Sequence, residues 1–202
     1  MAMSTTTKLN AINTMLSTVG EAPVNNLTSV TADVRIAESI LDEISREVQS
    51  TPWHFNTQHD VALAPDSTGN VNLASNVVRV DLEGANITSS YDIVIRGSKL
   101  FNKKTNSYVF TETLKYTTVS LLEWDDLPEN VKRYIMIRSS RIYQDRLLGS
   151  EKISRFTRGD EMAALLSLRE FEMETADYSI FDNYDVAKIV DRTSVINRLD
   201  RA

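Results

Sequence analysis

Pro52 marks a change in the repeat pattern of apolar residues, and this change constrains the fold more than any other feature of the chain. Before Pro52, apolar residues recur at helical spacing up to Val48. Proline blocks continuation of a helix and pushes the preceding residue, Thr51, toward an extended conformation. From residue 53 to residue 63, apolar and polar residues alternate as in a strand. The sequence therefore predicts that a helix ends here and a β segment begins.

The first residues of the alternating segment include one of the two tryptophans and one of the two histidines of the chain. On such a strand Trp53 and Phe55 share one side, and we expect them to be core residues that anchor the strand on the helices. His54 and Asn56 then face outward. His59 lies on the face opposite His54, so the pattern predicts that these two histidines cannot bind one metal ion together. A packing role is therefore favoured over a metal or catalytic site.

Four segments carry apolar residues at helical spacing, two before Pro52 and two after residue 124. Pro128 suits the first position of the third helix, and Gly149 suits its end. The fourth helix is expected from Ser150 to about Tyr178. The apolar faces are, helix by helix, Leu9, Ile12, Leu16 and Val19; Val34, Ala37, Leu41, Ile44 and Val48; Val131, Tyr134, Ile135 and Ile142; and Ile153, Phe156, Ala163, Leu166 and Phe171.

Residues 65–122 have the pattern of β structure. Alternating segments surround Val80, Ile93, Phe110 and Tyr116, and they are separated by turn sequences such as PDSTGN. The stretch RGSKLFNKKTNS is expected to be a polar loop. Its lysines, Lys99, Lys103 and Lys104, are more typical of a solvated hairpin tip than of a DNA-binding site.

These patterns predict an α+β fold. Residues 1–52 and 124–178 would form a four-helix bundle-like core, and residues 53–123 a β-rich insertion lobe between helices 2 and 3. Residues 179–202 follow a bundle that already looks complete, yet they are too apolar for a free tail. We therefore expect an extended C-terminal arm that docks on another surface. Its large apolar residues are Ile180, Phe181, Tyr184, Val186, Ile189, Val190, Val195, Ile196 and Leu199.

Composition narrows the classes of function. The 202 residues include no cysteine, which excludes disulfides and thiolate sites, and no cofactor or metal motif is present. The formal net charge of −6, with Glu170, Glu172 and Glu174 as a solvated acidic side of the fourth helix, gives no reason to expect tight binding to DNA. No apolar stretch has the length needed to span a bilayer, so membrane insertion is not expected.

The densest acidic cluster is EWDDLPEN, which contains Glu123, Asp125, Asp126 and Glu129. A pair of carboxylates is the requirement for glycoside hydrolysis, so an enzyme that degrades cell wall or surface polysaccharide is the alternative function. Acidic residues also stabilise the N-terminus of a helix, and this interpretation is favoured because sequence spacing alone cannot place two carboxyls across a sugar. We therefore expect no catalytic residue.

Four stretches in order give the chain a resemblance to a known family: LNAINTMLSTVGEAPVNNL, ILDEISREVQSTPWHFN, RGSKLFNKKTNSYVF and LPENVKRYIMIRSSRIYQDRLLGS. They resemble the tail tubular protein A family of short-tailed, autographivirus-type bacteriophages, the adaptor or gatekeeper proteins of the head-to-tail junction. The resemblance covers residues 9–178 and extends more loosely through the arm. Pro52 departs from the family pattern, which often has a glycine before the tryptophan.

The resemblance implies a virion protein, assembled in the bacterial cytoplasm, that forms a dodecameric ring between the portal protein and the tail nozzle protein. The helices would form the ring wall, and the β lobe would face the nozzle and the tail fibres. Genomic DNA would pass through the ring during ejection without tight binding. The arm would embrace the portal, and we expect Tyr184, Ile189 and Ile196 to be its anchors because they are large and spread along it.

Overall fold

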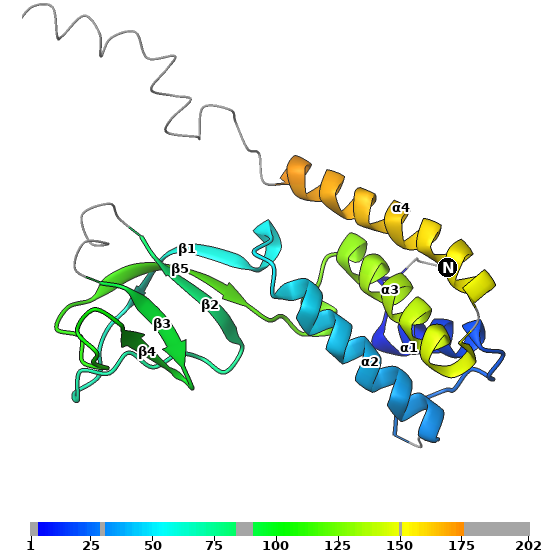
Figure 1. Ribbon diagram of the computed structural model, residues 1–202, viewed down its shortest axis with the longest axis horizontal. Helices are drawn as coiled ribbons and strands as arrows, with labels where there is room; N and C mark the ends of the chain where they lie inside the picture. The colour runs from blue at the N-terminus through cyan, green and yellow to red at the C-terminus, as the bar shows by residue number, and fades with distance from the viewer. Residues whose placement is uncertain (1–3, 29–30, 84–90, 150, 176–202) are drawn as a thin grey trace, which may run out of the picture.

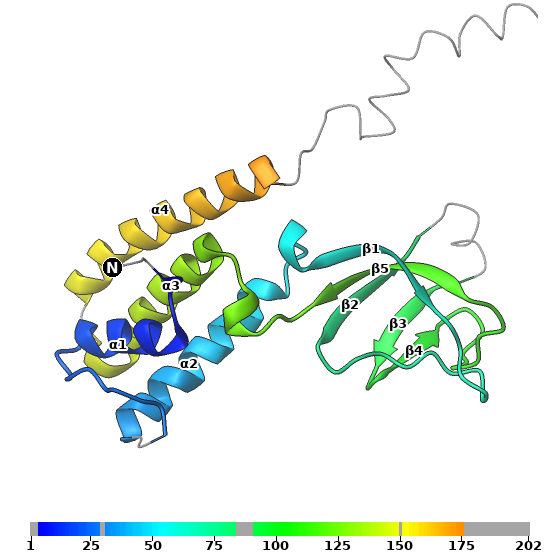
Figure 2. The same ribbon diagram turned by 180° about the vertical axis from the view of Figure 1, so that it is seen from behind.

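The computed structural model describes residues 4–28, 31–83, 91–149 and 151–175, with the side chains of residues 151–156 left aside. It has helices at one end and antiparallel strands at the other, which confirms the α+β class (Figures 1 and 2). The helices are α1 (Lys8–Thr18), α2 (Ala32–Gln49), α3 (Glu129–Leu148) and α4 (Glu151–Thr175), and the strands are β1 (Thr57–Leu63), β2 (Val77–Leu82), β3 (Ile93–Arg96), β4 (Lys99–Asn102) and β5 (Leu114–Ser120).

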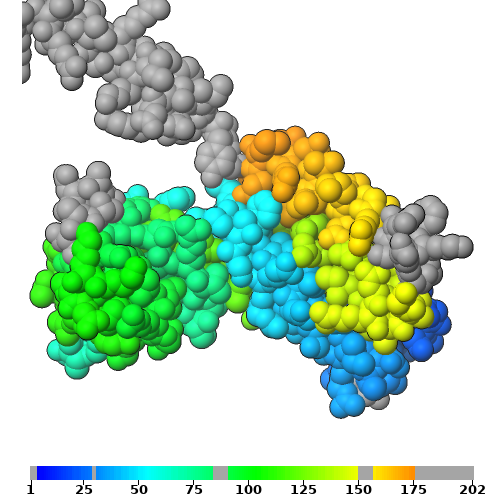
Figure 3. All heavy atoms as spheres, in the orientation of Figure 1, coloured from blue at the N-terminus to red at the C-terminus, as the bar shows by residue number. Residues whose placement is uncertain are grey.

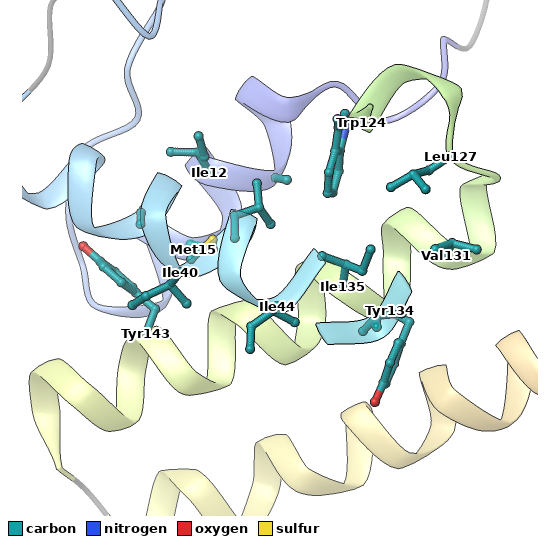
Figure 4. Close-up of a cluster of buried hydrophobic side chains, with 14 of the residues drawn as sticks. Ile12, Met15, Ile40, Ile44, Trp124, Leu127, Val131, Tyr134, Ile135 and Tyr143 are labelled. Carbon is teal, nitrogen blue, oxygen red and sulfur yellow. The ribbon is translucent and has the colours of Figure 1, made fainter. Parts of the chain in front are cut away.

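The helices are arranged around α3, which packs against each of the other three. In both ribbon views α3 lies between α4 on one side and α2 on the other. One face of α3 meets α1 and α2 through Ile135 and Tyr143, whereas Tyr134 points toward α4 (Figure 4). The buried apolar residues of this helical core are Ala11, Ile12, Met15, Leu16, Val34, Ala37, Ile40, Leu41, Ile44, Val48, Trp124, Leu127, Val131, Tyr134, Ile135, Tyr143, Ala164 and Leu168.

The ends of the helices follow local chemistry. Thr7 caps α1 by accepting a hydrogen bond from the backbone N of Asn10, and Thr31 caps α2 in the same way. Pro128 is the residue before α3, and Gly149 ends this helix in the left-handed conformation with φ of 60°. The predicted end at Gly149 is confirmed, because glycine alone adopts this conformation without steric cost.

The buried face of α4 differs from the prediction. Ala164 and Leu168 are buried against α3, whereas the predicted core residues Ala163 and Leu166 are exposed. Phe171 is half-buried and packs against the helical core, as expected. The described part of α4 ends at Thr175, and the side chains of Ile153 and Phe156 lie outside the description. The sequence of α4 is apolar on two neighbouring rows, so periodicity alone selected the wrong one.

The strands form a second structure with its own core, here called the β lobe (residues 57–120). β5 lies between β1 and β2 in an antiparallel three-stranded sheet, and β3 pairs with β4 as a hairpin. The buried residues between them are Val71, Val80, Leu100, Phe110, Leu114 and Tyr116. Burial raises the pKa of Tyr116 to about 12, because its ionised form would lose contact with water.

The prediction of a polar loop at RGSKLFNKKTNS is wrong, because this stretch contains strand β4. Leu100 belongs to the lobe core, and Phe101 is covered by Tyr108 and by the guanidinium of Arg96, which lies 3.6 Å from the ring centroid. Asn102 is buried and accepts hydrogen bonds from the backbone N atoms of residues 92 and 104. Leu100, Phe101 and Asn102 are therefore buried in succession, and a period of two could not reveal the strand.

Candidate functional site

The junction between the helices and the β lobe (residues 48–56 and 121–124) is built on the stretch that follows Pro52. His54–Asn56 form a turn of 3-10 helix, and β1 begins only at Thr57, so the predicted strand from Trp53 is wrong. Asn56, expected on the outside, is buried. Its side-chain amide donates to the carbonyl of Gln49 at 2.7 Å and its oxygen accepts from the N of Trp53 at 2.9 Å. The turn forms because Asn56 satisfies a carbonyl left open at the end of α2.

Trp53 makes the second contact with the end of α2. Its indole Nε1 donates to the carbonyl of Val48 at 2.8 Å, and its ring stacks on Phe55 with centroids 6.5 Å apart. Both aromatic residues are half-buried and pack against the helical core, while His54 between them is exposed. Trp53 thus combines apolar packing with capping of a helix carbonyl, and its role as an anchor is a proposal tested by mutation below.

Gln49 joins the two chain segments that lead into and out of the β lobe. Its side chain is 2% exposed, and its amide forms a pair of hydrogen bonds with the backbone of Leu122: Oε1 accepts from N at 2.7 Å and Nε2 donates to O at 3.2 Å. Sequence reasoning missed this residue. The signal was its position four residues after Ser45, on the row of α2 that contains the buried residues Ala37 and Leu41.

Helix α4 also reaches the junction. Glu172 Oε1 accepts a hydrogen bond from the backbone N of His54, across 118 positions of sequence. The second oxygen, Oε2, is buried without a hydrogen-bond partner among the described residues. Of the three acidic residues predicted to be solvated, Glu170 and Glu174 are exposed, but Glu172 is not. The end of α2, the base of the β lobe and the end of α4 therefore meet at one place.

The two histidines lie beside this junction. Both His54 and His59 line one hollow of about 220 Å³, together with Arg79 and Asp81. The expected separation of the histidines on opposite faces does not hold, because His54 lies in the turn before β1 and a bulge after residue 58 breaks the alternation of the strand. His59 Nδ1 lies 3.1 Å from Glu83 Oε1. Across the part of the chain that the structure describes, no cluster of three metal-binding side chains is found.

The acidic cluster holds the N-terminal segment against α3. Glu129 accepts hydrogen bonds from the backbone N and the hydroxyl of Thr6, and Trp124 Nε1 donates to the Thr6 carbonyl at 3.0 Å. The hydroxyl of Thr6 lowers the pKa of the Glu129 carboxyl, although a general acid would need the opposite shift. Asp125 and Asp126 are exposed in the turn before α3. This geometry fits acids at a helix N-terminus better than a glycosidase pair.

The predicted arm anchors Tyr184, Ile189 and Ile196 lie outside the described residues. Within residues 4–28, 31–83, 91–149 and 151–175, none of the helices combines the length and the apolar character that a bilayer crossing requires.

The structure defines an α+β protein in which a helical layer is joined to a β lobe through a hydrogen-bonded junction. The family model described as tail tubular protein matches residues 9–178, and the chain belongs to this family. It is thus a structural component of a phage tail that assembles with other tail and portal components. A search of curated proteins found no match.

Proposed function

We propose that this chain is the adaptor between the portal and the tail nozzle, and that twelve copies form a ring through which DNA leaves the head. The observation that carries the proposal is the family match over residues 9–178, which spans the four helices except Lys8 and the whole β lobe. A structural role is consistent with a junction whose polar groups are used to join segments, as the Gln49–Leu122 pair shows.

In this proposal the two parts of the chain have different partners. The helices form the wall of the ring as a bundle-like layer, and the β lobe faces the nozzle and the tail fibres. Residues 179–202 embrace the portal through Tyr184, Ile189 and Ile196. The support for this division is the presence of two separate cores, one helical and one in the β lobe, which lets each part present its own surface.

DNA is proposed to pass without tight binding. The net charge of −6 opposes adhesion to phosphate, and a cationic surface would be needed for strong, salt-sensitive affinity. Titration of the purified protein with duplex DNA at low and high salt tests this point. Binding that weakens steeply with salt would contradict it, and Lys99, Lys103 and Lys104 would then be the first residues to replace.

The mass of the purified protein, measured by native mass spectrometry with and without the portal, tests the ring directly. The proposal predicts a species of twelve chains bound to the portal. A single chain in both samples would overturn the adaptor ring, because no assembly would then exist for the portal to receive.

Truncation after Tyr178 tests the arm. The shortened chain should keep its melting temperature, because the described helical core and Phe171, which packs against it, all lie before residue 176. It should no longer attach to the portal, because the apolar residues of the arm would supply the buried contacts. A truncated chain that still attaches, or one that does not fold, would show that the arm has another role.

A further inference from the structure

A hollow of about 360 Å³ lies between α1, α3 and α4, and it is here called the helical hollow. Its α3 wall includes Arg133 and Ile137, and its α4 wall carries Asp160 and Ala163. In Figure 3 the atoms of α4 run from yellow, far from the β lobe, to orange, beside the junction. The hollow therefore lies along the first half of α4, and the arm leaves from the other end.

Two opposite charges line the helical hollow without a partner. The side chains of Arg133 on α3 and Asp160 on α4 are exposed, and neither forms an ion pair with another described residue. The other cation of the hollow, Arg141, is already paired with Glu161 and Asp145. The two walls thus present one free charge each, positive on α3 and negative on α4.

The α3 wall also holds an unused hydrogen-bond acceptor. Gln144 is 6% exposed, and its Nε2 donates to the carbonyl of Thr18 at 3.3 Å. Its Oε1 has no hydrogen-bond partner among the described residues. Arg158, the next cation along α4, lines a different hollow with Tyr134 and Met162. A free cation, a free anion and a free acceptor together fit a peptide segment better than a single ion, because a peptide carries N–H donors and side chains of both signs.

The arm contains side chains in the matching order. Val190, Asp191 and Arg192 follow one another as apolar, acidic and basic residues, and the same order recurs at residues 199–201. In an extended chain adjacent side chains point to opposite sides, and side chains two positions apart share a side. When the acidic residue faces the α3 wall, the apolar and basic residues both face the α4 wall.

The direction of the chain agrees with this arrangement. A segment that returns from the end of α4 runs opposite to the helix, so it passes Ala163 before Asp160. Val190 precedes Arg192 in the same sense, which brings the apolar residue to the alanine and the arginine to the aspartate.

The length of chain beyond α4 favours the first of the two stretches. Asp160 lies about 22 Å from Thr175 along the helix, at about 1.5 Å per residue. A chain as long as residues 176–189 has a root-mean-square end-to-end distance of about 21 Å, against about 26 Å for residues 176–198. Effective concentration is highest when this distance matches the span, so residues 190–192 are the better placed.

We propose that residues 190–192 of the arm occupy the helical hollow of their own chain before assembly. Asp191 pairs with Arg133, Arg192 pairs with Asp160, and Val190 packs on Ala163. The arm is thereby held against the helices of the free chain, which goes beyond the proposed adaptor role. Only the release of the arm by the portal rests on that proposed function.

The absence of cysteine from the chain allows a direct test. The full-length variant with Ala163→Cys and Val190→Cys is oxidised mildly in dilute solution without the portal, and bond formation is followed by loss of free thiols. The matched control pairs Val190→Cys with Met162→Cys, which lies at the other hollow and is 57% exposed. The proposal predicts a bond within one chain that forms about tenfold faster, or more, than in the control, because docking raises the local concentration of residue 190.

Exchange of charge supplies the second arm of the test. In the Ala163→Cys and Val190→Cys background, Asp191→Lys or Arg133→Glu alone should slow bond formation about twofold to fivefold, as expected for an exposed ion pair. The variant with both changes should recover the original rate. Because Arg133 is exposed, the melting temperature should stay unchanged and serves as the control for folding.

Three results would overturn the proposal. Equal rates with Ala163→Cys and Met162→Cys would show that the arm does not select the helical hollow. A faster bond from Ala163→Cys to Leu199→Cys would show that the second stretch is the occupant. Covalent dimers in place of a bond within one chain would show that the hollow receives the arm of another copy. Since the portal is absent, each of these results leaves the proposed ring untouched, and failure of the ring leaves this contact untouched.

Discussion

The helical part and the β lobe are stabilised in different ways. All four helices contribute to one apolar core, which also receives Trp124 and Leu127 from the segment before α3. The β lobe has a smaller core, and its loops depend more on polar contacts. Asp66, for example, accepts hydrogen bonds from Thr68, Asn70 and Asn72, and the Thr68 hydroxyl contributes most to lowering the pKa of its carboxyl.

One chain can therefore present two kinds of surface. Apolar packing around α3 fixes the helices as a unit, and the lobe has a shape set by loops and short strands. No residue is shared between the two cores. The junction joins them through hydrogen bonds between the side chains of Gln49 and Asn56 and backbone atoms. The lobe should therefore be able to lose order without unfolding the helices, and the four predictions below test this difference.

The largest effect is expected from removing a side chain from each core. Ile135 and Leu100 are both 0% exposed, and truncation of a buried isoleucine or leucine to alanine typically costs about 2–5 kcal/mol. Ile135→Ala should lower the melting temperature of the helices followed by far-ultraviolet circular dichroism. Leu100→Ala should increase amide exchange in residues 57–120 and leave the helical signal nearly unchanged. Equal loss of helix in both variants would show a single cooperative unit, and Ile36→Ala, at an exposed site, is the control.

Trp53→Ala should have the next largest effect, because it removes both apolar packing and the cap on Val48. Truncation of a fully buried tryptophan costs about 3–5 kcal/mol, and the partial exposure of Trp53 places the expected loss at about 3 kcal/mol. The matched control is His54→Ala, which removes an exposed side chain and should be nearly silent. Chemical denaturation measures both. Similar losses in the two variants would mean that Trp53 does not anchor the junction.

Gln49→Ala should have a smaller effect, centred on the junction. It leaves the backbone N and O of Leu122 without their partner, at a cost of about 1–3 kcal/mol for buried polar groups. Ser45→Ala is the control, because it removes only the contact of Gln49 Nε2 with the Ser45 hydroxyl. Amide exchange should rise at residues 121–124 in the first variant alone. A uniform rise over the whole chain would indicate that the junction is not a separate element.

The smallest effect is expected from removing the charge of one hydrogen-bonded carboxylate in each part of the molecule, Glu129 in the helical part and Glu83 in the β lobe. The pKa of Glu129 is lowered by the Thr6 hydroxyl, and that of Glu83 by the Thr117 hydroxyl. A pKa that is lowered in the folded state stabilises the protein at pH above the unfolded pKa of about 4.3, and this contribution is lost as the pH falls through the folded pKa. Because Glu129 is largely exposed, the contribution is under about 1 kcal/mol.

Melting temperatures between pH 7 and pH 3 measure this contribution. Glu129→Gln and Glu83→Gln should each melt below the unmodified chain at pH 7, and the difference should shrink as the pH falls below about 4.3. A difference that stays constant down to pH 3 would show that the charge of the carboxylate is not what stabilises either contact.

Helix α2 could be predicted from the sequence because it buries a single face with period 3.6, which includes Val34, Leu41 and Val48. The buried face of α4 could not, because Ala163 and Leu166 are as apolar as Ala164 and Leu168, and only the position of α3 decides between the two rows.

The junction and β4 escaped prediction for reasons of local chemistry. Asn56 and Gln49 are polar residues whose burial depends on backbone partners that become neighbours only in the folded chain. Leu100 and Phe101 are covered on both faces of a short strand, so the alternation that reveals an edge strand is absent. The family resemblance was confirmed, whereas the ring and its partners stay proposals.

Electron cryo-microscopy of the full-length protein bound to the portal of its phage tests the proposed adaptor ring. The proposed adaptor predicts a ring whose wall consists of helical layers in contact with one another, with the β lobes directed away from the portal. A ring whose wall is made by the β lobes, or a complex in which neighbouring copies do not touch through their helices, would contradict it.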